Sequence, residues 1–198
     1  MTHPPGAARI PDAPVDPQFP RRWSPRSFTA EPVTQDELRS LFEAARWAPS
    51  SGNEQPWIYL YANSPDDHRR FLDLLDNGNQ SWAFRAPVLA FVIARQHTRK
   101  GNPNRTAQFD TGSSWMSLAL QARRLGLYAH GMAGFDVDRS YHVLHVPRDR
   151  YSVMAAIAIG HRGDPSVLAE KNRVRESPNS RNPVSAFAFP GVMPEELR

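Results

Sequence analysis

Apolar residues recur at three- and four-residue spacing in two long segments of the chain. Thr34 and Glu37 form a capping-box sequence ahead of the first segment and Pro49 follows it, so a helix with one buried face is predicted between them. The second segment spans residues 110–125 and is followed by Gly126, which suits a left-handed C-terminal cap. We expect this second helix to lie in the core of the domain.

Four segments have the aromatic, β-branched or continuously apolar composition of strands: 57–62, 88–94, 128–132 and 151–159. Residues 88–94 are apolar at every position, which is typical of a strand that is covered on both faces. Further helices are predicted after Ser64 and from Asp136, and the first of these is expected to end at Asn77 and Gly78, where positive φ is accessible. Strands therefore alternate with helices, as in a three-layer α/β or α+β domain.

The 198 residues fit one domain. Residues 1–20 are rich in proline and alanine and are expected to form a flexible segment ahead of a single domain at 21–198. After Asp164 the chain is polar and broken by proline, apart from the residues around Phe187 and Phe189. This tail cannot carry a core of its own, so we expect it to wrap around the domain or around a second copy of the chain.

Composition excludes several kinds of chemistry. The chain has no cysteine, so demanding chemistry must come from another side chain or from a bound cofactor. P-loop, dinucleotide-binding, nucleophile-elbow and zincin motifs are missing, and His142 and His145 lack a nearby third ligand, so no metal site is expected. Because no apolar run approaches the roughly 18 residues of a membrane span and the start lacks a secretory signal, a cytoplasmic protein is expected.

Two polar motifs carry the candidate chemistry. Residues 21–27 read RRWSPRS and offer guanidinium and hydroxyl groups that could converge on a phosphate monoester. A solvated basic turn and a nucleic-acid-binding arm are the alternatives. Residues 49–57 read PSSGNEQPW and form a loop that can offer backbone N–H groups, hydroxyls and amides to one planar polar ligand. A turn that satisfies its own backbone explains residues 50–53 well, but not residues 55–57.

With three later motifs added, the chain resembles the FMN-dependent nitroreductase family over residues 21–183. The motifs that carry the resemblance are RWSPRSF at 22–28, PSSGNEQPW at 49–57, the helix at 110–126, GMAGF at 131–135 and SRNP at 180–183. The resemblance implies an α+β fold, a three-layer α/β/α sandwich in which two identical chains interlock as a homodimer. Two FMN sites then lie at the interface between the chains.

The resemblance also implies roles for individual residues. Arg22 and Arg181 correspond to phosphate contacts, and the loop at 49–53 to a segment delivered by the partner chain. Asn79 corresponds to an amide that faces the flavin pyrimidine, and residues 132–134 to a strand end that faces flavin N5. The complete implied set of FMN-binding residues is Arg22, Trp23, Ser24, Arg26, Pro49, Ser50, Ser51, Asn53, Gln55, Asn79, Met132, Ala133, Gly134 and Arg181.

Three positions depart from the pattern of the better-studied members. Ala133 stands where some carry Glu, Trp82 where some carry Lys near the flavin, and Asn179 where some have a second cation. Trp82 and Asn179 each remove a positive charge. The site therefore either holds FMN less tightly or is completed by another arginine.

The implied function is that of an NAD(P)H-dependent FMN oxidoreductase that reduces an electron-poor small molecule, such as a nitroaromatic or a quinone. The flavin carries the redox chemistry, so no catalytic side chain is required, and Arg26 is expected near flavin N1 and O2, where negative charge develops. Without a separate dinucleotide motif, NAD(P)H and the acceptor are expected to take turns at one flavin face in a ping-pong mechanism. Neither nucleic acid nor a membrane is expected as a partner. A flavin-binding sensor or carrier without reductase turnover is the alternative.

Overall fold

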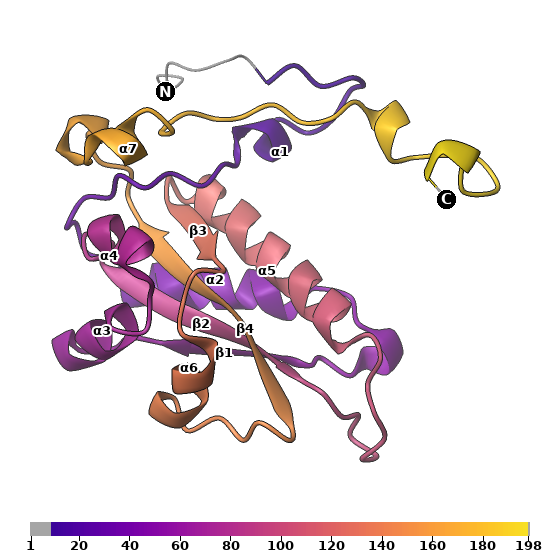
Figure 1. Cartoon of the computed structure of the whole chain (residues 1–198), viewed down its shortest axis with the longest axis horizontal. Coiled ribbons are helices and arrows are strands. Elements are labelled where there is room, and N and C mark those ends of the chain that lie inside the picture. Colours follow the sequence, from indigo (N-terminus) through magenta and orange to yellow (C-terminus); the bar gives the residue numbers. More distant parts are fainter. Residues whose placement is uncertain (1–8, 198) are drawn as a thin grey trace.

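An antiparallel sheet forms the centre of the computed structural model, which describes residues 9–197. Its four strands lie in the order β1-β2-β4-β3 (Figure 1). They are β1 (Trp57–Tyr61), β2 (Val88–Arg95), β3 (Tyr128–Met132) and β4 (Tyr151–Gly160). The four predicted strands are confirmed, and β2 pairs with a neighbour on each side, as its continuous apolar sequence predicted.

Helices cover both faces of this sheet, so the predicted three-layer α+β arrangement is confirmed (Figure 1). The helices are α1 (Gln18–Arg21), α2 (Gln35–Arg46), α3 (Pro65–Leu72), α4 (Asn77–Ala83), α5 (Ala107–Arg124), α6 (Val137–Val143) and α7 (Glu170–Arg173). Val88 and Val92 of β2 face α2 and α5, whereas Leu89 and Phe91 face α3, α4 and α6. Because successive strand side chains point to opposite faces, covering both faces requires an apolar residue at every position.

The predicted caps of the two long helices are present. Thr34 accepts a hydrogen bond from the Glu37 N–H at 3.2 Å, and the Glu37 carboxylate accepts one from the Thr34 N–H at 2.8 Å, so α2 starts with a capping box. Gly126 has a φ of +81° directly after α5. Leu118 and Ala122 of α5 are buried, which confirms this helix as part of the core.

The prediction that a helix ends at Asn77 and Gly78 is wrong. The helix α3 stops at Leu72, and neither Asn77 nor Gly78 has a positive φ, because both lie in a further helix, α4, which the sequence analysis missed. Asp76 caps α4 by accepting a hydrogen bond from the Asn79 N–H at 2.7 Å. Aspartate and asparagine serve turns and helix starts equally well, so the local sequence does not distinguish the two.

The N-terminal segment and the C-terminal tail run along the same side of the domain (Figure 1). The Val184 N–H donates to the Asp12 carboxylate at 2.8 Å. Of the predicted flexible segment, residues 1–8 lie outside the described residues. Short 3-10 helices occur at Ser51–Asn53, Pro165–Val167, Val184–Ala186 and Glu195–Leu197. Within the described part of the chain, no helix has both the length and the apolar character needed to cross a bilayer.

Candidate functional site

Residues 21–27, the arginine segment, precede the first long helix and are held by the carboxylate of Glu176 from the far end of the chain. Buried Glu176 accepts hydrogen bonds from the backbone N–H groups of Arg26, at 2.8 and 3.0 Å, and of Ser27, at 3.0 Å. The Ser27 hydroxyl also lies 2.8 Å from this carboxylate and is fully buried. Ser27 is therefore a structural residue, and Glu176 fixes the backbone from which the Arg26 side chain extends.

Trp23 anchors the same segment in the core. Its ring is buried, meets Tyr128 edge-on at 6.0 Å between centroids, and lies 5.2 Å beneath the Arg162 guanidinium. The next residues of the segment are fixed by His130, whose Nδ1 lies 2.7 Å from the Pro25 carbonyl oxygen. Since a carbonyl only accepts, Nδ1 carries the proton in this pair. Trp23 thus supports the segment from below, and its predicted FMN contact stays a prediction.

Three guanidinium groups gather beside this segment. Arg22 donates to the Ser24 hydroxyl at 3.3 Å, and Arg9 donates to the Arg22 carbonyl at 2.6 Å. Burial lowers the pKa of Arg22, and the charges of Arg9 and Arg181 lower it further. Among the described residues, no carboxylate forms an ion pair with any of the three. Such an uncompensated cationic group fits an anion with several oxygens.

The predicted residues Asn79 and Gly134 lie in contact, although 55 positions separate them in the chain. The Asn79 amide donates to the Gly134 carbonyl at 2.9 Å, and the Asp76 N–H donates to the same oxygen at 3.0 Å. A Cβ at Gly134 would lie only 2.0 Å from the Asp76 carboxylate, so only glycine fits there. Met132 next to this contact is buried, and Ala133 is exposed.

Trp82 does not occupy an open position near a ligand. Its indole is fully buried, stacks on Phe28 with 6.2 Å between ring centroids, and packs against His130 at 4.6 Å. A lysine at this point of α4 would have to place its charge in the hydrophobic core. Trp82 therefore contributes to core packing and not to the charge of the site. Its contact with His130, which lies against the Pro25 carbonyl, connects α4 to the segment that carries Arg22.

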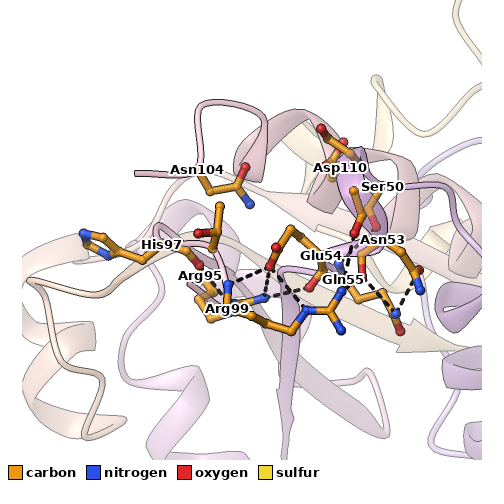
Figure 2. Close-up of polar contacts among 12 residues, drawn as sticks. Ser50, Asn53, Glu54, Gln55, Arg95, His97, Arg99, Asn104 and Asp110 are labelled. Atoms are coloured by element: carbon orange, nitrogen blue, oxygen red, sulfur yellow. Dashed lines mark hydrogen bonds and ion pairs between the residues drawn. The ribbon is translucent and has the colours of Figure 1, made fainter. Parts of the chain in front are cut away.

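The predicted loop at 49–55 is a rigidly held structure at another part of the domain (Figure 2). Gly52, Asn53 and Gln55 all have positive φ, between 48° and 57°. The Ser51 N–H donates to Asp110 at 3.1 Å, and the Gln55 N–H donates to the Ser50 hydroxyl at 3.0 Å.

Charged neighbours fix this loop from outside (Figure 2). The Glu54 carboxylate accepts from the Arg95 guanidinium at 3.1 Å and from the Arg99 N–H at 2.9 Å. Arg99 in turn donates to the Asn53 carbonyl at 2.7 Å. The outer surface stays accessible, because Pro49, Ser51, Asn53 and Gln55 are exposed. The Ser50 hydroxyl satisfies a backbone N–H of the loop, as the simple-turn interpretation predicted, whereas Asp110 and Arg99 satisfy further backbone groups from outside the loop.

One chain keeps the two predicted halves of the site apart. Asp110, which holds the loop, lies near the start of α5, whereas the Arg123 guanidinium near its end lies 3.9 Å above the ring of Tyr128, the neighbour of Trp23. Thirteen residues of helix separate Asp110 from Arg123, which corresponds to about 20 Å at about 1.5 Å per residue. The arginine segment lies near Arg181 at one end of α5, and the loop lies at the other end.

Several residues of the site escaped the sequence analysis. Glu176, Arg9, Arg95 and Arg99 hold or complete the predicted segments from positions that are distant in the chain. No motif surrounds them, and only an unusual burial of charge, as at Glu176, distinguishes them once the structure is known.

We expect His130 to make the free energy of unfolding depend on pH. Burial lowers the pKa of His130 to about 4, and although the Pro25 carbonyl acts in the opposite direction, the charge of Arg26 lowers it further. An unfolded histidine titrates near 6.5, so the unfolded chain alone takes up this proton between about pH 6.5 and 4. Stability is therefore lost as pH falls through this window, with a slope of up to about 1.4 kcal/mol per pH unit.

The measurement is denaturant unfolding between pH 7.5 and 4 for the wild type and His130→Gln. The variant should show a shallower decline, whereas a control substitution at exposed His142 should leave the slope unchanged. Equal slopes for the wild type and His130→Gln would show that His130 does not stay neutral in the folded protein.

Comparisons with known proteins place this geometry in a family. The model of the nitroreductase family matches residues 20–161. A protein of Streptomyces coelicolor that is named "Putative NADH dehydrogenase/NAD(P)H nitroreductase" is 29% identical over 171 residues, which cover 75% of this chain and 83% of the relative. The chain is also similar to a solved structure described as "the oxidoreductase containing FMN", with 44% identity, a TM-score of 0.90 and coverage of 98% and 99% of the two chains. A nitroreductase family protein from Clostridium difficile shares the fold at 20% identity and a TM-score of 0.69, over 89% of this chain and 97% of its own.

Proposed function

Since this chain belongs to the nitroreductase family, we propose that it acts as an NAD(P)H-dependent FMN oxidoreductase whose acceptor is an electron-poor small molecule. When bound, FMN supplies the redox chemistry through its isoalloxazine ring. The observation that carries the proposal is the pair formed by Arg22 and Arg181, whose charges no carboxylate of the described residues neutralises in an ion pair. Two guanidinium groups with the Ser24 hydroxyl beside them fit the oxygens of a phosphate monoester.

The contact between Asn79 and Gly134 fits the ring end of the same cofactor. One amide N–H of Asn79 is used by the Gly134 carbonyl, which leaves the amide oxygen and the second N–H for the edge of a planar polar ring. The missing side chain at Gly134 allows the strand end and Asp76 to approach each other closely. We infer that Met132, Ala133 and Gly134 present backbone groups to the ring.

Arg26 provides positive charge at this site. Burial lowers the pKa of Arg26, with a further contribution from the neighbouring Arg175, yet an arginine side chain stays protonated at neutral pH. Glu176 holds the Arg26 backbone, so the guanidinium starts from a fixed point. A cation held in advance where negative charge develops stabilises that charge without reorganisation, and no acid or nucleophile is needed from the protein.

We also propose that two chains share each site. Asp110, which holds the loop at 49–55, lies about 20 Å along α5 from Arg123, which packs on Tyr128 beside Trp23 of the arginine segment. A two-fold axis would bring the loop of a second chain to that segment and create two equivalent sites. Apolar side chains exposed on α5, such as Phe109 and Met116, and on the tail, such as Phe187, supply surface for this contact.

The test is the spectrum and the steady-state kinetics of the purified protein. We expect visible flavin absorbance, and oxidation of NADH or NADPH by the FMN-loaded protein when a quinone or nitroaromatic is added. Because donor and acceptor use one space in turn, double-reciprocal lines at several acceptor concentrations should be parallel.

Three results would contradict parts of this proposal. A colourless protein that takes up no added FMN would exclude the cofactor. Tight FMN binding without NAD(P)H oxidation would indicate a sensor or carrier. Intersecting kinetic lines would reveal a separate nucleotide site.

A further inference from the structure

Arg9 links the two chain segments that carry the predicted phosphate contacts. On one side its guanidinium donates to the Arg22 carbonyl at 2.6 Å and to the Pro20 carbonyl at 3.3 Å. On the other side it donates to the Asn179 carbonyl at 2.9 Å and to the Asn179 side-chain oxygen at 3.2 Å. The two contacts with Asn179 span 170 positions of sequence, so Arg9 fastens the tail to the arginine segment.

The charge of Arg9 remains uncompensated in this arrangement. All four oxygens that it contacts belong to neutral carbonyl or amide groups, and no carboxylate of the described residues pairs with it. A guanidinium has five N–H donors, so one remains without an acceptor among the described residues. Burial and the charge of Arg181 both lower the pKa of Arg9, as expected for cations that are crowded together without an anion.

Asn179 explains how this crowding is arranged. Its side-chain oxygen accepts from Arg9 at 3.2 Å and from Arg181 at 3.4 Å, so one neutral acceptor orients two guanidinium groups. A lysine or arginine at position 179 could not do this, because neither side chain has an acceptor. Asn179 therefore carries no charge itself, but its side-chain oxygen positions the guanidinium of Arg9 from the N-terminal segment.

We propose that Arg9, oriented by Asn179, is a third cationic contact for the phosphate of the bound cofactor, beside Arg22 and Arg181. This inference rests on the proposed function, since it assumes that FMN is the ligand. It assigns a binding role to the chain ahead of α1, which the sequence analysis treated as a flexible extension.

The test compares FMN with riboflavin, which carries the same ring system and no phosphate. Apo-protein is titrated with each flavin, and binding is followed by fluorescence quenching. We expect Arg9→Gln to weaken FMN binding about tenfold, the order expected for the loss of one charge-assisted contact, and to leave riboflavin binding unchanged. Arg9→Lys should retain most of the FMN affinity, because it keeps the charge.

A matched control removes the same charge elsewhere. Arg124 is exposed in the last turn of α5, and Arg124→Gln should change neither affinity. Circular dichroism of each apo-variant verifies that the protein is folded.

The outcomes separate the inference from the proposed function. If Arg9→Gln keeps the wild-type ratio of FMN to riboflavin affinity, Arg9 does not contact the phosphate, while the proposed function stands. Equal weakening of both flavins would assign Arg9 a purely structural role and overturn the inference. If the wild type itself binds neither flavin, the proposed function fails first.

Discussion

Replacing Arg22 and Arg181 by alanine should weaken FMN binding more than any other pair of substitutions in the chain. A charge-assisted hydrogen bond contributes about 1.5–3 kcal/mol, so each single variant should lose roughly one to two orders of magnitude in affinity. The double variant should lose about 3–6 kcal/mol if the two effects add, although neighbouring groups commonly couple. Titration of the apo-proteins with FMN measures these losses.

The stability of the apo-protein gives a second readout of the same prediction. Burial lowers the pKa of Arg22 most, and the charges of Arg9 and Arg181 lower it further, so these cations repel one another in the absence of an anion. Removing one cation relieves this repulsion, so Arg22→Ala should not lower the Tm of the apo-protein, while it reduces the gain in Tm that FMN produces.

A control at exposed Arg69, which forms an ion pair with Asp66 on the surface of α3, should leave FMN affinity unchanged. Wild-type affinity in both Arg22→Ala and Arg181→Ala would place the phosphate elsewhere on the protein.

Deleting the residues after Pro183 should separate the chains and release the flavin together. The tail leaves Phe187 and Phe189 with 67% and 40% of their surface exposed, so its removal would cost a single chain little (Figure 1). If the two rings are buried against a partner, each contributes about 1.5–3 kcal/mol to the dimer. The loop at 49–55 would then no longer be held next to the partner's arginine segment, and flavin would dissociate.

Sedimentation velocity with detection at the flavin absorbance band measures both effects at once. We expect the truncated protein to sediment as a colourless monomer at concentrations where the full chain is a yellow dimer. The double variant Phe187→Ala/Phe189→Ala in the full-length chain distinguishes the contribution of the two aromatic rings from that of the rest of the tail. It should produce most of the effect of the deletion. A monomer that carries one FMN per chain would refute the shared site.

Much of the fold follows from local sequence alone. The spacing of apolar residues placed α2, α5 and the four strands within a few positions of their observed bounds, because burying one face of a helix or both faces of a strand constrains every residue in it. Gly126 marked the end of α5 for an equally local reason, the positive φ that a left-handed cap requires. Aspartate and asparagine are common both in turns and at helix starts, so the same reasoning failed at Asp76 and Asn77, and α4 was missed.

The candidate site divides in the same way. Arg22 and Ser24 could be nominated from the motif at 21–27, because clustered guanidinium and hydroxyl groups have a recognisable chemistry at any depth in the fold. Arg181 was nominated only through the family resemblance.

The residues that hold these groups could not be found in this way. Glu176 reaches the backbone of Arg26 across 150 positions, and Arg9 reaches Asn179 across 170. Contacts at such separations leave no periodicity and no motif, since each depends on the path of the whole chain. The amino-acid sequence by itself therefore determined the strands, the long helices and the chemistry of the proposed phosphate contacts at 21–27. Folding alone decided which distant carboxylate and which distant arginine meet them, because only the packed core fixes the distance between segments that are remote in sequence.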